Sequence, residues 1–178
     1  VAAAGRRIVE LIAEDVRPRD ILTPAAFRDA VTAMLAISAS VNTLKHLQAV
    51  AVEAGTDADI YALFEELAPK TPLLAAVKPN GTRRIDEFES AGGTQALLHS
   101  LSPLLNLDRT TVAGPSVRTT PTADPDVIRP LDNPFARHPG IVLVRGTLAP
   151  DGGVAKRTVA DDGVRAFRGP AKVFRSRE

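Results

Sequence analysis

The sequence contains no cysteine and no tryptophan, and aromatic residues make up only 4% of its 178 residues. Without cysteine, the chain forms no disulfide and offers no thiolate to a zinc ion or an iron–sulfur cluster. With so few rings, the core must be built from Ala, Val, Leu and Ile. No apolar run approaches the roughly 20 residues that span a bilayer. We expect a cytoplasmic protein, since the absence of cysteine fits that compartment.

The chain also lacks an excess of either charge, because 22 basic and 21 acidic residues leave a formal net charge of +1. Whole-chain electrostatics therefore favours neither nucleic acid nor a membrane as partner, and we expect neither. The only methionine, Met34, lies well inside a chain that starts at Val1. A GTG start codon or excision from a longer protein explains this, and we favour the longer protein.

Residues 1 to about 113 show helical periodicity. Thr23 and Pro24 are typical of an N-cap and a first helical residue, and Gly55 is typical of a helix end. Another amphipathic helix is predicted within residues 56–69, with Asp57 or Asp59 near its start. In the helix that Pro24 opens, the residues expected in the core are Phe27, Val31, Met34 and Leu35.

Short polar stretches indicate where helices are interrupted. We expect residues 17–20 to break the first helix, and Gly92 with Gly93 to separate two later ones. Asn80 and Gly81 predict a turn with the positive φ angles that these residues tolerate. The acidic run at residues 86–89 is interpreted as a solvated first helical turn rather than a catalytic carboxylate pair.

From residue 110 onward, the composition becomes rich in Thr, Pro and Gly, and then β-branched. Short strands are predicted within residues 140–148, 153–159 and 171–174. The Asp-Gly-Gly stretch at residues 151–153 predicts a hairpin turn. The sequence thus predicts an α+β fold with too few strands to close a β domain.

Several strings occur in a fixed order along the whole chain. AGRRIVEL, AVEAGTD, LLAAVKPNGT and ESAGGTQALL lie in the helical part, and VIRPLDNP, GIVLVRGTLAPDGGVAK and FRGPAKVF lie in the β part. Together they resemble the dihydroxy-acid and sugar-acid (phosphogluconate) dehydratase family. The resemblance implies that residues 1–113 are the helical end of an α/β N-terminal domain. Residues 114–126 would then cross to the first strands of a β-barrel-like C-terminal domain at 127–178.

The resemblance also implies an activity. Members of this family are hydro-lyases that convert a 2,3-dihydroxy acid, branched-chain or sugar-derived, into a 2-keto acid, with an iron–sulfur cluster and Mg²⁺. The family's metal ligands and catalytic serine match no position here, so we expect neither a catalytic residue nor a bound cofactor in this segment. The parent enzyme is expected to be a homo-oligomer, a dimer or a tetramer. The alternative is a non-catalytic binding or assembly module that kept the scaffold.

One stretch combines the family pattern with possible chemistry. Residues 38–42 read Ser-Ala-Ser-Val-Asn, where the family has Gly-Gly-Ser-Thr-Asn, so only Ser40 and Asn42 match. A bend into a helix N-terminus presents N–H groups to an anionic ligand, which makes these two residues candidates for substrate binding. Both are equally typical of a helix cap, the interpretation that we favour.

Two other features are weaker indications of a functional site. His46, His99 and His138 have no second ligand at a metal-binding spacing, so no metal site is predicted. The C-terminal run VRAFRGPAKVFRSRE interleaves basic and aromatic residues. Single-stranded nucleic-acid binding and a strand with outward basic positions both explain that run.

Overall fold

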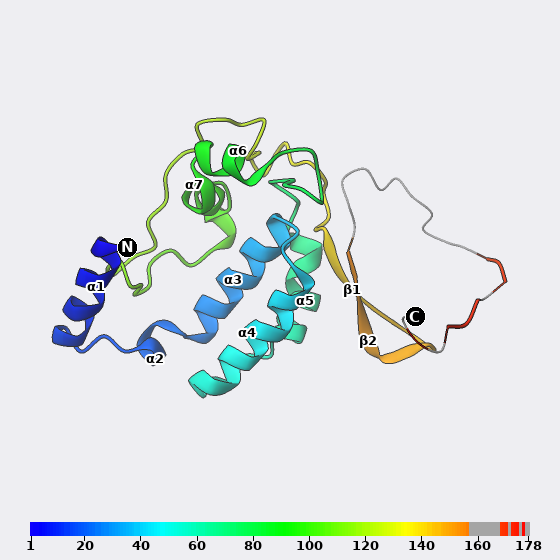
Figure 1. Cartoon of the computed structure of the whole chain (residues 1–178), viewed down its shortest axis with the longest axis horizontal. Coiled ribbons are helices and arrows are strands. Elements are labelled where there is room, and N and C mark those ends of the chain that lie inside the picture. Colours follow the sequence, from blue (N-terminus) through cyan, green and yellow to red (C-terminus); the bar gives the residue numbers. More distant parts are fainter. Residues whose placement is uncertain (157–167, 171, 175, 177–178) are drawn as a thin grey trace.

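The computed structural model describes residues 1–156, 168–170, 172–174 and 176. Figure 1 shows helices in the centre, with a two-stranded hairpin at one side and the first helix at the other. The predicted α+β class is confirmed. No helix in the described part of the chain is long and apolar enough to cross a membrane. The elements are α1 (Ala2–Ala13), α2 (Pro18–Ile21), α3 (Pro24–Ala36), α4 (Val41–Ala54), α5 (Ile60–Leu67), α6 (Ile85–Ser90), α7 (Gly93–Ser100), β1 (Ile141–Gly146) and β2 (Ala149–Lys156), with 3-10 turns at Ala68–Lys70 and Ser102–Leu104.

The central helices begin and end where local signals predict. The Thr23 hydroxyl accepts a hydrogen bond from the N–H of Ala26 at the start of α3, and Pro24 follows as its first residue. Asp59 caps α5 in the same way. Gly55 ends α4 with a φ of 74°, a left-handed conformation that costs glycine little. The four residues predicted for the core of α3 are all buried.

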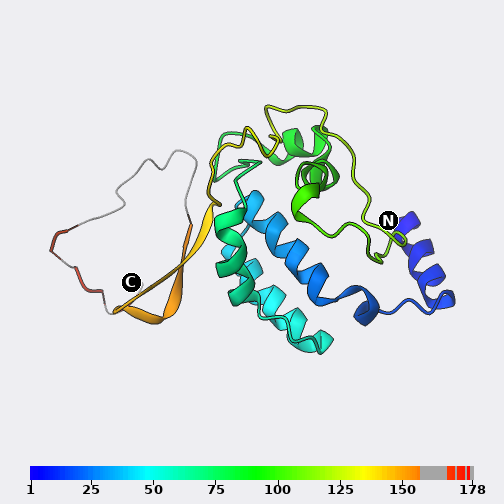
Figure 2. The same cartoon turned by 180° about the vertical axis from the view of Figure 1, so that it is seen from behind.

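Two apolar clusters hold the chain together. One joins α3, α4 and α5, which lie side by side in both views, and takes in Ile141 from β1 (Figures 1 and 2). The other joins α6 and α7 to Val127 and Ile128, two residues that follow the Thr- and Pro-rich segment. Hydrogen bonds from Ala123 and Thr122 to the carbonyl of Ala91 fix that segment against α6. The chain between the helices and the hairpin is therefore anchored by packing.

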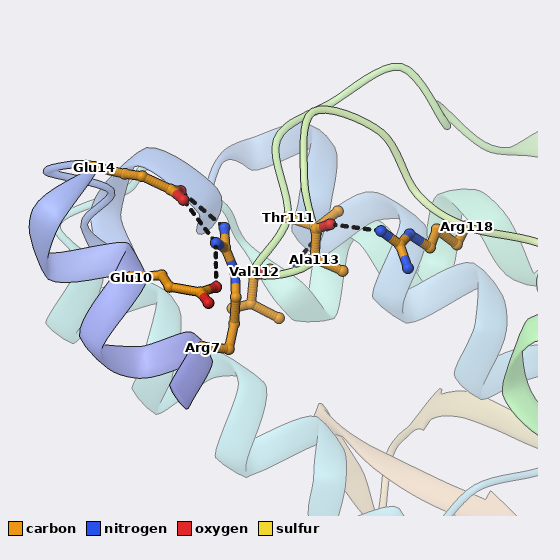
Figure 3. A network of polar contacts seen from close by, with 7 residues as sticks. All are labelled: Arg7, Glu10, Glu14, Thr111, Val112, Ala113 and Arg118. Carbon is orange, nitrogen blue, oxygen red and sulfur yellow. Dashed lines mark hydrogen bonds and ion pairs between the residues drawn. The ribbon is translucent and has the colours of Figure 1, made fainter. Parts of the chain in front are cut away.

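Helix α1 contributes no buried residue and is held by polar contacts (Figure 3). The Arg7 guanidinium bonds to Glu10 and Glu14 on its own helix and donates to the carbonyl of Val112 at 2.6 Å. The bond from Arg7 lowers the pKa of the Glu14 carboxyl. Nearby, Arg118 donates to the carbonyl of Ala113 at 3.2 Å. One arginine thus links the first helix to a loop more than 100 residues further along the chain.

The predicted break after the first helix is confirmed, since α1 ends at Ala13 and residues 17–20 do not continue it. Pro18 instead opens the short helix α2, and the Asp20 carboxylate accepts from the N–H of Arg17. The turn prediction for Asn80 and Gly81 was wrong in detail. Asn80 and Gly81 form a turn without positive φ angles, after a cis Lys78–Pro79 peptide. Glycine is needed at position 81 for space, since a Cβ there would lie 2.3 Å from the carbonyl oxygen of Ala76.

The hairpin turn is also misplaced in the sequence-based prediction. Gly146 pairs with Ala149, so residues 147 and 148 form the turn. Asp151, Gly152 and Gly153 lie within β2, where the pairing is irregular opposite Val144 and Gly146. The φ of 105° at Gly152 fits a bulge, which is the reason that a turn-like sequence occurs inside a strand.

Predictions beyond the hairpin are only partly covered by the structure. The strand expected at residues 171–174 does not form over the described residues 172–174. Residues 157–159 of another predicted strand lie outside the described residues, as does most of the basic and aromatic run. Within that run, Lys172 lies over the ring of Phe174, with its nitrogen 5.1 Å from the ring centre.

Candidate functional site: a cationic cleft at the start of helix α4

A cleft of about 430 Å³ lies where the helical part meets the end of the hairpin. It is lined by the bend at residues 37–40 between α3 and α4, by residues 77–80, by the α6 side chains Ile85 and Phe88, and by Lys156 at the end of β2. Four segments distant in sequence therefore form one surface around the candidate residue Ser40.

The bend itself has an unusual conformation. Ser38 adopts a φ of 50°, a left-handed value that non-glycine residues rarely take. Ser40 then begins α4, and its hydroxyl accepts a hydrogen bond from the N–H of Asn42 at 3.3 Å. Ser40 is thus a helix cap that also lines the cleft. Asn42 lies in the first turn, exposed, and is not among the described residues that line the cleft. Their role in substrate binding stays a prediction.

Two buried polar side chains form the floor of the cleft. The Asn80 amide nitrogen donates to the carbonyl of Ser38 at 2.7 Å, which fixes the orientation of the amide. The Ser38 hydroxyl and the Asn80 amide oxygen are both buried, and neither has a hydrogen-bond partner among the described residues. A buried polar atom without a partner typically costs about 1–3 kcal/mol. Both atoms belong to residues that line the cleft.

Among the described residues, the charged side chains that line the cleft are both lysines, Lys78 and Lys156. The Lys156 ammonium donates to the carbonyl of Ala39 at 3.1 Å, which leaves two of its three N–H groups for a ligand. Helix α4, which starts here, adds the partial positive charge of its N-terminus. The cleft therefore favours an anion.

Two acidic side chains of α6, a helix that lines the cleft, are paired with arginines. Asp86 bonds to Arg84, which lowers the pKa of its carboxyl. Glu87 accepts from the backbone N–H of Arg84 and from Arg83, and these bonds lower its pKa as well. As a result, neither carboxylate competes for the cleft's lysines.

A second cleft, of about 530 Å³, runs between α3 and α5, and it makes a weaker candidate. Its charged lining includes Arg28 and Glu66, which bond to each other. Neither unpartnered polar atom lies in it. Three carboxylates, those of Asp57, Asp59 and Glu66, line it beside a single arginine among the described residues, so it does not favour an anion as the cationic cleft does.

The described residues do not fit a metal or an iron–sulfur cluster. The chain has no cysteine, and no three His, Asp or Glu side chains gather within the described residues. His99 contacts Thr119 and His138 contacts a backbone carbonyl. The iron–sulfur cluster and Mg²⁺ that the resemblance implies therefore find no ligand set in the described residues.

Sequence reasoning located the bend but missed most of the cleft. Lys78 and Asn80 stand in the string LLAAVKPNGT, which carries part of the family resemblance. In the sequence, Asn80 is interpreted as a turn residue, and Lys78 is given no role of its own. Lys156 stands in the hairpin, 117 residues from the carbonyl that it binds. Nothing local in the sequence joins these residues.

Comparison with known proteins defines the class first. Residues 1–120 match the family described as dihydroxy-acid/6-phosphogluconate dehydratase N-terminal, and residues 126–178 match its C-terminal counterpart. The chain belongs to the dihydroxy-acid/6-phosphogluconate dehydratase family, which confirms the resemblance seen in the sequence.

Two curated relatives show how similar the chain is to individual proteins. The chain is 42% identical to a dihydroxy-acid dehydratase of Caldicellulosiruptor saccharolyticus, over 98% of this chain and 33% of that protein. It is 42% identical to a dihydroxy-acid dehydratase of Pyrococcus furiosus, over 98% of this chain and 32% of that protein. The chain thus spans about a third of the length of the curated relatives that it matches.

Proposed function

We propose that this chain is a segment of a hydro-lyase that removes water from a 2,3-dihydroxy acid and releases a 2-keto acid. Family membership and the names of its relatives support this reaction. The proposal includes an iron–sulfur cluster and Mg²⁺ held by other parts of a cytoplasmic, homo-oligomeric parent, since the described residues supply no ligand set. The 178-residue chain alone is expected to be inactive.

The proposal also covers the domain arrangement. Residues 1–113 would be the helical end of the N-terminal domain, residues 114–126 the crossing, and residues 127–178 the start of the C-terminal domain. In this arrangement the cleft uses both domains, because Ser40 belongs to the first and Lys156 to the second.

The cationic cleft is the observation that carries the proposal. An acid substrate brings a carboxylate, and the cleft offers two ammonium groups and a helix N-terminus, with no carboxylate among its described lining residues. Ser40, and Asn42 beside it, are the proposed substrate-binding residues of the bend. The chemical contribution of this chain is then positioning, which lowers the barrier because a bound substrate reacts from a fixed orientation.

A segment exchange tests this function. The matching third of the Pyrococcus furiosus dihydroxy-acid dehydratase is replaced by this chain, and formation of 2-keto acid from 2,3-dihydroxy-3-methylbutanoate and from D-gluconate is measured. The control is the same relative with its own segment rejoined at the same junctions. We expect the chimera to dehydrate at least one of the two acids.

A chimera that folds and carries its full cluster but dehydrates neither acid would contradict the proposed function. The same result would favour a non-catalytic binding or assembly module on the dehydratase scaffold.

A further inference from the structure

Helix α1 presents an apolar surface to solvent. Ile8, Val9 and Ile12 are 63%, 64% and 76% exposed, and they lie on one side of the helix. Gly5 lies on the same side, where a Cβ would meet nothing within 4 Å. These four residues form the α1 stripe. Among the described residues, nothing covers it, since α1 has no buried side chain.

The contacts that hold α1 use its other side. Arg7 donates to the carbonyl of Val112, and Glu10 and Glu14 bond to Arg7 (Figure 3). At 3.6 residues per turn, residues 7, 10 and 14 share one face, and residues 5, 8, 9 and 12 fall on the opposite face. An amphipathic helix normally turns its apolar face toward a core. Here the charged face contacts the rest of the chain and the apolar face does not.

A helix in this position lacks its usual source of stability. Helix α1 has 12 residues, and helices shorter than about 12–15 residues are marginal in water on their own. Packing of the apolar face supplies most of the stability of such a helix in a folded protein. The α1 stripe is therefore a surface that a partner would stabilise by covering it.

We propose that the α1 stripe packs against an uncharged, aliphatic surface in the remainder of the parent's N-terminal domain. The inference rests on the proposed function for the existence of that parent and goes beyond it by assigning the surface that joins this segment to the rest. The chain spans about a third of the length of its curated relatives. A parent of that length therefore has ample chain outside residues 1–178 to cover the stripe.

The size of the stripe favours this occupant over a second copy of the chain. A stable interface between two proteins buries about 800 Å² on each partner, contributed by roughly 20–30 residues. The stripe offers three large side chains, too few to offset the freedom that two separate molecules lose on association. A surface in the same polypeptide avoids most of that loss, because the chain already holds the two parts close together.

The charges of α1 favour a protein surface over a membrane. Its charged side chains are those of Arg6, Arg7 and Glu10, and Glu14 follows directly after its last residue. The two positive and two negative charges cancel. Helices that lie on a membrane typically carry an excess of Lys and Arg on the polar face, which attracts anionic lipids. The α1 stripe itself has no charged residue, as is typical of surfaces that become part of a core.

The absence of cysteine from this chain provides the test. Ile12→Cys is made in the 178-residue chain and in the segment-exchange chimera, and its labelling by a maleimide is followed by mass spectrometry of the α1 peptide. Arg6→Cys, at an exposed position on the same helix outside the stripe, is the matched control. We expect labelling of Ile12→Cys to be at least about tenfold slower in the chimera than in the chain, and labelling of Arg6→Cys to differ less than about threefold.

The other outcomes would overturn the inference. Equal labelling of Ile12→Cys in both proteins would mean that the stripe stays exposed in the parent. Equal slowing of both variants in the chimera would mean that α1 is covered without preference for the stripe. Labelling of Ile12→Cys in the 178-residue chain that slows as the protein concentration rises would identify a second copy as the occupant.

Failure of this inference is distinguishable from failure of the proposed function, because labelling does not depend on activity. An active chimera with a freely labelled stripe leaves the dehydratase assignment standing and overturns the inference. A protected stripe in a folded but inactive chimera leaves the inference standing and contradicts the proposed function.

Discussion

Replacing Ser38 by glycine is expected to stabilise the chain, and the size of the effect can be worked out from the structure. A left-handed conformation costs a residue with a Cβ about 1–2 kcal/mol, which glycine avoids. Removing the buried, unpartnered hydroxyl recovers about 1–3 kcal/mol. Glycine gives back about 0.5–1 kcal/mol through the greater freedom of the unfolded chain.

The sum predicts a gain of about 3 kcal/mol in the free energy of unfolding for Ser38→Gly. For a chain of this size, the melting temperature should rise by roughly 6–12 °C. Ser38→Ala separates the two causes, because it removes the hydroxyl and keeps the Cβ in the left-handed conformation. It should give a rise of roughly 4–8 °C, from the hydroxyl alone. Both values are read from thermal unfolding followed by circular dichroism.

Ser40→Gly is the matched control two residues away. Ser40 has an ordinary φ of −65° and caps α4 with its hydroxyl, so glycine there should lower stability by a few tenths of a kcal/mol. A melting temperature that falls or stays constant in Ser38→Gly would refute the reasoning. If Ser38→Ala matched Ser38→Gly, the left-handed backbone would cost no more than the stability that glycine gives back through the freer unfolded chain.

Two further predictions concern other parts of the chain. Bonds from Arg28 and Lys70 lower the pKa of the Glu66 carboxyl to about 2, so its stabilising effect is complete above its unfolded value and is lost as the pH falls from about 4.5 to 2. The melting temperature of Glu66→Gln should therefore fall less steeply across that range than that of the wild type. Gly81→Ala should destabilise the chain by about 1–3 kcal/mol, measured by urea unfolding, because the new methyl group would overlap the backbone of Ala76.

Controls exist for both predictions. Glu53→Gln removes a carboxylate whose side chain makes no hydrogen bond or ion pair among the described residues, so it is the matched control for the loss of one negative charge. An acid dependence of Glu66→Gln equal to that of the wild type would contradict the first prediction. Gly5→Ala adds the same methyl group to α1, where nothing lies within 4 Å, and should stabilise by about 0.5–1 kcal/mol. If Gly81→Ala behaved like Gly5→Ala, the close approach to Ala76 would not exist.

The sequence predicted features whose causes are local. Thr23 with Pro24, Asp59 and Gly55 bound helices through contacts within one turn, so their spacing alone was sufficient. Gly81 was expected because it tolerates a positive φ angle. It is needed for space instead, since the backbone of Ala76 lies against it. Likewise, the pairing of β1 and β2 decides which residues form the turn.

Some residues of the candidate site have local causes and others do not. Ser40 could be predicted because a helix cap depends on residues next to one another in the sequence. The strained Ser38 could not be found, since a φ angle follows from packing on both sides of the bend. Asn80 and Lys156 reach the bend through hydrogen bonds across 42 and 117 residues, and no periodicity reports contacts of that range.

The most direct test of the central claim is the KM of the segment-exchange chimera for 2,3-dihydroxy-3-methylbutanoate. Lys78→Gln is compared with Lys45→Gln, which removes the same charge from an exposed position on α4 outside the lining of the cleft. If the cleft of this chain holds the substrate carboxylate, Lys78→Gln should raise KM about tenfold and leave kcat within about twofold, while Lys45→Gln changes neither. A KM that Lys78→Gln leaves unchanged in an active chimera would contradict the claim that this cleft binds the substrate.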